Sequence, residues 1–159
     1  RDTIGPESID IAISQRVLIN LLSREDQVLA RNNVAEATSS GGFLIFIECF
    51  DTGLKNLNEA RSEFDLAPLP PAHHNLYLTD DFFENSGLAP CDNLLSEDPK
   101  NFLSTHYYVT RVLHELALGG RPFVRNSHFV RFMSRALAQN VGEFSPIRAG
   151  IFRKSESPK

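Results

Sequence analysis

The stretch from Ser39 to Phe50, SSGGFLIFIECF, constrains the fold more than any other part of the chain. Its two glycines are followed by an unbroken apolar run from Phe43 to Ile47, which ends at Glu48. A short, glycine-bounded run of β-branched and aromatic residues predicts a strand buried on both faces, as in a parallel sheet covered by helices. Ligands of open α/β sheets sit beyond the carboxyl ends of strands, so Glu48 either faces a ligand crevice or is the first solvated residue after a core strand.

Length and charge limit the class of protein. A chain of 159 residues is the size of one domain, and a domain of this length buries roughly 70% of its unfolded surface. The net charge of -4 leaves no excess of Lys and Arg to follow a phosphate backbone, so we expect no nucleic-acid partner. No apolar run is long enough to cross a bilayer, and no signal-peptide pattern is present. We therefore expect a cytoplasmic protein without a membrane partner.

The segment before the apolar run predicts a second strand and a connecting helix. Residues Ile9 to Ile13 read as a strand. Ser23 and Asp26 have the spacing of a helix-capping pair, which predicts a helix from about Arg24 to Thr38, and Gly41 suits the left-handed residue that ends it. A helix that crosses over between the two strands makes them parallel neighbours.

The remaining pattern alternates helical and extended periods, with loop signals between them. Three prolines within residues 68–71 predict an ordered, extended loop. We expect a helix capped by Asp51 or Thr52, a short helix from Asp80 to Asn85 capped by Thr79, a strand between Leu88 and Leu95, helices from Phe102 to Leu118 and from Asn126 to Gln139, and a final strand from Ile147 to about Lys154.

Polar residues of the proline-rich loop are candidates for binding. His73 and His74 are adjacent, and adjacent side chains of an extended loop point apart, so we expect no shared metal. His74, Asn75 and Tyr77 either project over a cleft or bond to nearby backbone, as most polar side chains do.

The patterns around the other candidate side chains favour structural roles over catalysis or metal binding. Tyr107, Tyr108 and Arg111 favour core packing and a surface salt bridge over a site. His114 begins HELAL, which lacks the second histidine of a zinc-protease helix. Cys49 and Cys91 have no partner at metal-ligand spacing, so we expect small buried side chains and no metal site.

Taken in order, the segments IDIAISQRVLINL, SSGGFLIFIECFDTGLKNLNEAR, HHNLYL, STHYYVTRVL and IRAGIFRK resemble the carboxyl-terminal half of a class I S-adenosylmethionine-dependent methyltransferase. In that family a loop and a glycine pair precede the fifth strand, as Ser39 to Gly42 do here, and the last two strands pair antiparallel. The resemblance implies an α/β fold: the carboxyl-terminal half of a doubly wound Rossmann-like sheet, mostly parallel with an antiparallel last strand. It makes residues 1–154 a partial domain and residues 155–159 a frayed tail.

Two family features have no counterpart in this chain: the glycine-rich loop after the first strand and the acidic residue that holds the cofactor ribose. The resemblance implies that both lie upstream of residue 1, so the cofactor-binding residues are unknown here. The only methionine is Met133, which agrees with residue 1 not being a translation start. The chain would then hold the fourth to seventh strands, and we expect it to bind S-adenosylmethionine weakly or not at all by itself.

The resemblance implies that the complete protein transfers a methyl group from S-adenosylmethionine to a small molecule. Glu48 and His74 are the candidate catalytic bases, and Arg16, Asn75 and Tyr77 the candidate substrate-binding residues. The alternative is a noncatalytic half-domain or partner-binding module. In either case we expect an unpaired edge at Ile9 to Ile13 to cause self-association or pairing with a missing amino-terminal half.

Overall fold

The computed structural model describes residues 4–91 and 101–155, which form a mixed α/β structure around a four-stranded sheet in the order β1-β2-β4-β3. Strand β1 (Ile9–Gln15) lies parallel to β2 (Thr38–Cys49), and β4 (Ile147–Lys154) pairs antiparallel with both β2 and β3 (Leu88–Pro90). Three strands therefore run in one direction and the last strand opposes them. The predicted central strand, its parallel neighbour and the antiparallel last strand are confirmed.

Helix α1 (Arg24–Ala37) begins where its sequence signal predicts. The Ser23 side chain accepts a hydrogen bond from the Asp26 amide at 3.1 Å. Its end differs from the prediction, because Thr38 is already extended and starts β2 directly. Gly41 does have a positive φ of 75°, but it lies inside β2 and does not end the helix.

The other helices lie where the sequence predicts them, but their caps and regularity differ from the prediction. The predicted helix from Phe102 to Leu118 is interrupted by a π-helical turn, and Gly119 ends it in the left-handed conformation. Neither Asp51 nor Thr52 caps α2, because Phe50 occupies that position. The observed elements are η1 (Leu18–Asn20), α2 (Asp51–Ser62), η2 (Asp80–Phe83), α3 (Ser104–Tyr108), the π turn η4 (Val109–Leu113), α4 (His114–Leu118) and α5 (His128–Ala136).

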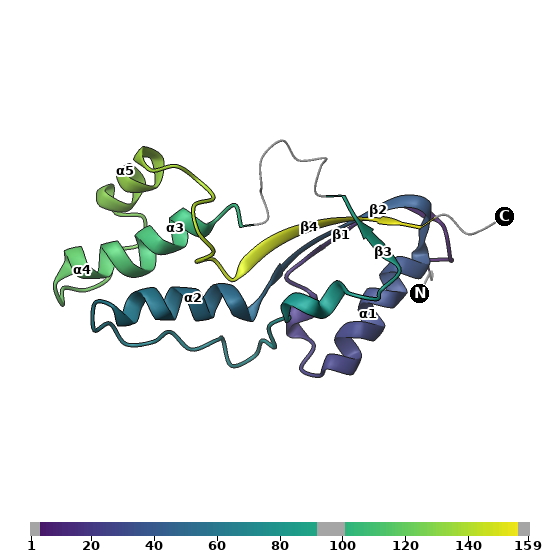
Figure 1. The fold of residues 1–159 in the computed structure, drawn as a ribbon, viewed down its shortest axis with the longest axis horizontal. Helices are drawn as coiled ribbons and strands as arrows, with labels where there is room; N and C mark the ends of the chain where they lie inside the picture. The colour runs from purple at the N-terminus through teal and green to yellow at the C-terminus, as the bar shows by residue number, and fades with distance from the viewer. Residues whose placement is uncertain (1–3, 92–100, 156–159) are drawn as a thin grey trace.

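The helices are placed unevenly around the sheet (Figure 1). α1 lies on one side of it, and α2, α3, α4 and α5 gather beyond the carboxyl ends of β1 and β2, on the left of the view. The strand predicted up to Leu95 is seen as far as Pro90, and residues 92–95 lie outside the described residues, as does the tail after residue 155.

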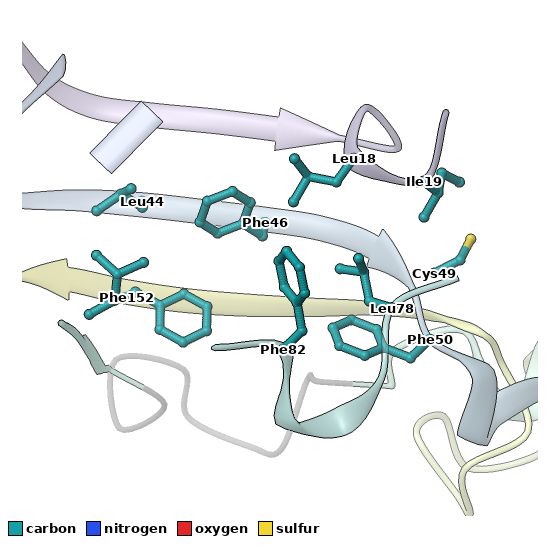
Figure 2. Packing of buried hydrophobic residues seen from close by; sticks show 10 residues of the cluster. Leu18, Ile19, Leu44, Phe46, Cys49, Phe50, Leu78, Phe82 and Phe152 are labelled. Carbon is teal, nitrogen blue, oxygen red and sulfur yellow. The ribbon is translucent and has the colours of Figure 1, made fainter. Parts of the chain in front are cut away.

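The core lies between the sheet and the elements on the α1 side (Figure 2). Leu44 and Phe46 of β2 are fully buried there, and the Phe46 ring packs against Phe83 at 4.9 Å and Phe152 at 6.0 Å between ring centroids. Burial of each such side chain contributes about 1.5–3 kcal/mol. The cluster comprises Leu18, Ile19, Leu44, Phe46, Cys49, Phe50, Leu78, Phe82, Leu88 and Phe152.

The opposite face of the sheet is open within the described residues. Ile11 and Ile13 of β1 are 57% and 67% exposed, whereas Ser14, on the core face, is buried. The alternate residues of β2, Phe43 and Ile45, are only half-buried. The prediction that β2 is buried on both faces is therefore wrong for the described residues. The second helix layer of a doubly wound sheet stays a prediction.

Strand β1 is also the edge of the sheet, so alternate backbone groups along it face away from β2. An apolar, unpaired edge recruits another strand, and we expect the 159-residue chain to self-associate. Replacing Ile11 and Ile13 together with Lys should raise the dissociation constant at least about tenfold, because paired edges would bring like charges together. Light scattering during size exclusion measures this.

The matched control is Leu29→Lys, which places the same charge on an exposed apolar position of α1 away from the edge. We expect it to leave association unchanged. A wild-type chain that remains monomeric at all concentrations would show that the edge does not recruit a partner.

Candidate functional site

The carboxylate of Glu48 lies at the carboxyl end of β2 and is fully buried, with 0% of its surface exposed. The alternative prediction, that Glu48 is the first solvated residue after a core strand, is therefore wrong. Oε1 accepts three hydrogen bonds, from Ser14 Oγ at 2.8 Å, the Val17 amide at 3.0 Å and the Leu18 amide at 3.2 Å. Oε2 is buried with no hydrogen-bond partner. Glu48 thus joins the end of the central strand to the turn that follows β1.

That turn has a sharp backbone at Arg16, where φ is +54°, a left-handed conformation that few residues other than glycine adopt. The Arg16 amide donates to the carbonyl of Ile47 at 2.8 Å, and its carbonyl accepts from the Asn20 side chain at 2.7 Å. Holding a non-glycine residue in this conformation costs on the order of 1–2 kcal/mol. The hydrogen bonds around Arg16 and those to Glu48 offset this cost.

The segment 72–79 crosses the same edge of the sheet. The Leu78 amide donates to the carbonyl of Cys49 at 2.9 Å, and the Leu76 amide to that of Ile19 at 2.8 Å. The fully buried Gln27 of α1 links η1 to the segment 72–79, since its side-chain amide donates to the carbonyls of Leu18 and Leu76. The proline-rich loop is therefore held over the carboxyl ends of β1 and β2.

This loop brings Tyr77 near Cys49 and Arg16, and the helix that begins at Ser104 adds Tyr107, which the sequence analysis assigned to core packing. Tyr77 interacts electrostatically with Cys49, Tyr107 and Arg16. We call Arg16, Glu48, Cys49, Tyr77 and Tyr107 the carboxyl-edge cluster.

The titration of the cluster is controlled mainly by burial. Burial raises the pKa of the Cys49 thiol to about 11; Arg16 opposes the shift and Glu48 adds to it. Burial likewise raises the pKa of Tyr77 and of Tyr107, with a further contribution from Cys49 in each case. At neutral pH the thiol and both phenols are therefore uncharged, so the phenols are hydrogen-bond donors and Cys49 is no thiolate nucleophile.

Asn75 lies on the wall of a cavity of about 720 Å³ between α2 and the loop, which Tyr77 also lines. The side-chain oxygen of Asn75 is buried without a hydrogen-bond partner. An unpartnered acceptor of this kind suits a donor from a ligand or from water. Tyr77 thus lies at both the cavity and the carboxyl-edge cluster.

His74 is not brought to the cluster. It is exposed, and it lies in a tight turn in which the Asn75 amide donates to the Ala72 carbonyl at 2.9 Å. The two adjacent rings do not point apart as predicted, since His73 and His74 meet edge to face at 5.0 Å. Even so, no group of three His, Cys, Asp or Glu side chains among the described residues is arranged to hold a metal.

The pattern around Arg111 is partly as predicted. Tyr108 packs its ring against Phe144 at 4.8 Å. The predicted salt bridge is wrong for Arg111, because within the described part of the chain the nearby Glu115 pairs with Arg61, at 2.6 Å. Arg61 is itself buried and donates to the carbonyls of Ala67 and Arg111, so it joins α2 to the loop that follows it and to the π turn η4.

Glu48 does not by itself offer a site for S-adenosylmethionine. The free oxygen of Glu48 is enclosed beneath the turn at Val17 and Leu18, so it has no exposed surface to offer a ribose or an ammonium group. The polar groups that remain at the edge are Arg16 and the two tyrosines, which suit part of a small ligand only.

No family model matches the chain, and no curated protein matches it. A solved structure that it resembles is the "putative sarcosine dimethylglycine methyltransferase" of Galdieria sulphuraria, with 12% sequence identity and a TM-score of 0.42. The match covers 96% of this chain and 55% of that one, so the chain spans about half of its length. Within residues 4–91 and 101–155, no helix has the length and apolarity that crossing a bilayer requires.

The raised pKa of Cys49 makes stability depend on pH. The folded protein disfavours the thiolate form of Cys49. The free energy of unfolding is therefore highest below the ordinary thiol pKa of 9.0, and it decreases as the pH rises to about 11. The stability of the wild type relative to Cys49→Ala should therefore fall between pH 8 and 11, by on the order of 2 kcal/mol. Urea unfolding at several pH values measures the difference.

Cys91→Ala is the control, since Cys91 is partly exposed and lies in another part of the sheet. We expect its stability to follow that of the wild type at every pH. If the free energies of unfolding of the wild type and of Cys49→Ala change in the same way with pH, the burial argument is contradicted.

Proposed function

We propose that the protein transfers a methyl group from S-adenosylmethionine to a small-molecule acceptor, and that this chain is the substrate-side half of the catalytic domain. The observation that carries the proposal is the buried Glu48, which fixes the turn after β1 and leaves Arg16, Tyr77 and Tyr107 together at the carboxyl edge. The order of sequence segments supports the methyltransferase class, and the antiparallel pairing of β3 with β4 agrees with the arrangement that the resemblance implies.

The roles follow from charge and position. Methyl transfer depends mainly on alignment of the acceptor, so groups that orient it matter more than a strong base. Arg16 supplies a cation for an anionic part of the acceptor, and Tyr77 and Asn75 supply a neutral donor and an unpartnered acceptor. Glu48 acts first as a positioning residue. The turn at Val17 and Leu18 encloses Oε2, so this oxygen acts as a base only where that turn opens to the acceptor in the complete protein.

His74 remains the alternative base. Its ring is exposed, so it serves only an acceptor that reaches the outer side of the loop. The cofactor, when bound, supplies the methyl group, and in this proposal most of its binding site belongs to residues outside this chain.

A noncatalytic role is the second candidate function, and one observation favours it. The exposed Ile11 and Ile13 of the edge strand are suited to pairing with another polypeptide, which a partner-binding module requires.

The test uses the full-length protein that contains this chain, with labelled S-adenosylmethionine and a panel of small acids, amines and phenols. Tyr77→Phe should lower kcat/KM about tenfold, the loss expected for one hydrogen bond to the acceptor. Glu48→Gln should lower kcat about 10²-fold if Oε2 is the base, with a melting temperature within a few degrees of the wild type.

Glu63→Gln is the matched control, because Glu63 is exposed at the end of α2 and lies outside the cluster. Unchanged kinetics in Tyr77→Phe and Glu48→Gln would remove the cluster from the reaction. A protein that neither binds the cofactor nor transfers methyl to any acceptor would favour the noncatalytic role.

A further inference from the structure

Positive charge is concentrated in one part of the chain. Residues 101–142 contain five arginines and a single acidic residue, Glu115, although the whole chain carries a net charge of -4. The carboxylate of Glu115 is bound by the buried Arg61 from α2, at 2.6 and 3.2 Å. Within residues 101–142 no other carboxylate is therefore present to pair with these arginines, and an excess of positive charge attracts anions.

Two of these arginines line one cavity. It has a volume of about 470 Å³ and lies between the helix of α3 and η4 on one side and residues 123–130 on the other. Arg111 comes from the helix and Arg125 from the opposite segment, and neither forms an ion pair with any described residue. The lining residues are His106, Thr110, Arg111, Phe123, Arg125, Asn126 and Val130.

The other polar groups of the cavity suit an anion as well. His106 uses Nδ1 in a hydrogen bond with Ser134 Oγ at 3.1 Å, which leaves Nε2 for another partner. Asn126 precedes Ser127, the capping residue of α5, so this helix begins at the cavity wall. The first turn of a helix carries a partial positive charge, which adds to that of the two guanidinium groups.

We propose that this cavity binds the phosphate group of a phosphate-bearing ligand between Arg111 and Arg125. Two guanidinium groups that line one cavity match the charge of a phosphate dianion, and each can bind two phosphate oxygens at once, whereas a carboxylate carries only half of that charge. The cavity is much larger than a phosphate ion, so the ligand has an organic part, and Phe123 and Val130 supply apolar contacts for it. The cavity lining contains none of the residues of the carboxyl-edge cluster, and the proposal does not depend on the proposed methyl transfer.

Calorimetric titration of the 159-residue chain with inorganic phosphate at low ionic strength tests the proposal. We expect saturable binding in the wild type, and at least tenfold weaker binding in Arg111→Gln and in Arg125→Gln. Both side chains are exposed, so these substitutions should leave the melting temperature nearly unchanged. Arg131→Gln removes the same charge from α5 outside the cavity and should weaken binding less than twofold.

A second arm distinguishes the source of the phosphate. Glycerol phosphate is the soluble probe, and vesicles of phosphatidylcholine with phosphatidic acid are the lipid probe. Tighter binding of glycerol phosphate than of inorganic phosphate indicates a soluble ligand, and sedimentation with vesicles that Arg111→Gln and Arg125→Gln abolish indicates a lipid headgroup. The proposal is overturned if phosphate does not bind at tens of millimolar, or if Arg131→Gln weakens binding as much as the two cavity variants do.

Discussion

The buried carboxylate of Glu48 is the interaction on which the carboxyl edge of the sheet depends. Removing a carboxylate from water costs several kcal/mol unless its hydrogen bonds are replaced. Here Oε1 receives three donors, two of them the backbone amides that follow the sharp turn at Arg16. Such charge-assisted hydrogen bonds are about twice as strong as neutral ones. One side chain thereby fixes the path after β1, the start of η1 and the position of Arg16.

Much of the fold could be predicted because its signals are local. The glycine-bounded run up to Ile47 and the capping pair of Ser23 and Asp26 each lie within a few residues of what they specify. The burial of Gln27 and Arg61 could not be predicted, since each occupies a helix as an ordinary polar residue. Their partners are carbonyl groups brought in by loops, which only the tertiary structure places beside them.

The candidate site was partly predictable for the same reason. Arg16 and Glu48 end parallel neighbouring strands, so they meet at one edge. Tyr107 was considered but assigned to core packing, because its helix follows a long connection and the sequence does not place that helix beside β1 and β2. Arg111 and Arg125 gave no local motif, although the excess of arginine in residues 101–142 was visible in the sequence.

Hydrogen exchange at the amides of Val17 and Leu18 tests most directly whether Glu48 organises this edge. The account predicts that Glu48→Ala exposes both amides and lowers their protection at least about tenfold, because each loses its acceptor. Glu48→Gln, which keeps a side-chain oxygen, should retain most of the protection. Equal protection of the two amides in the wild type and Glu48→Ala would contradict the account.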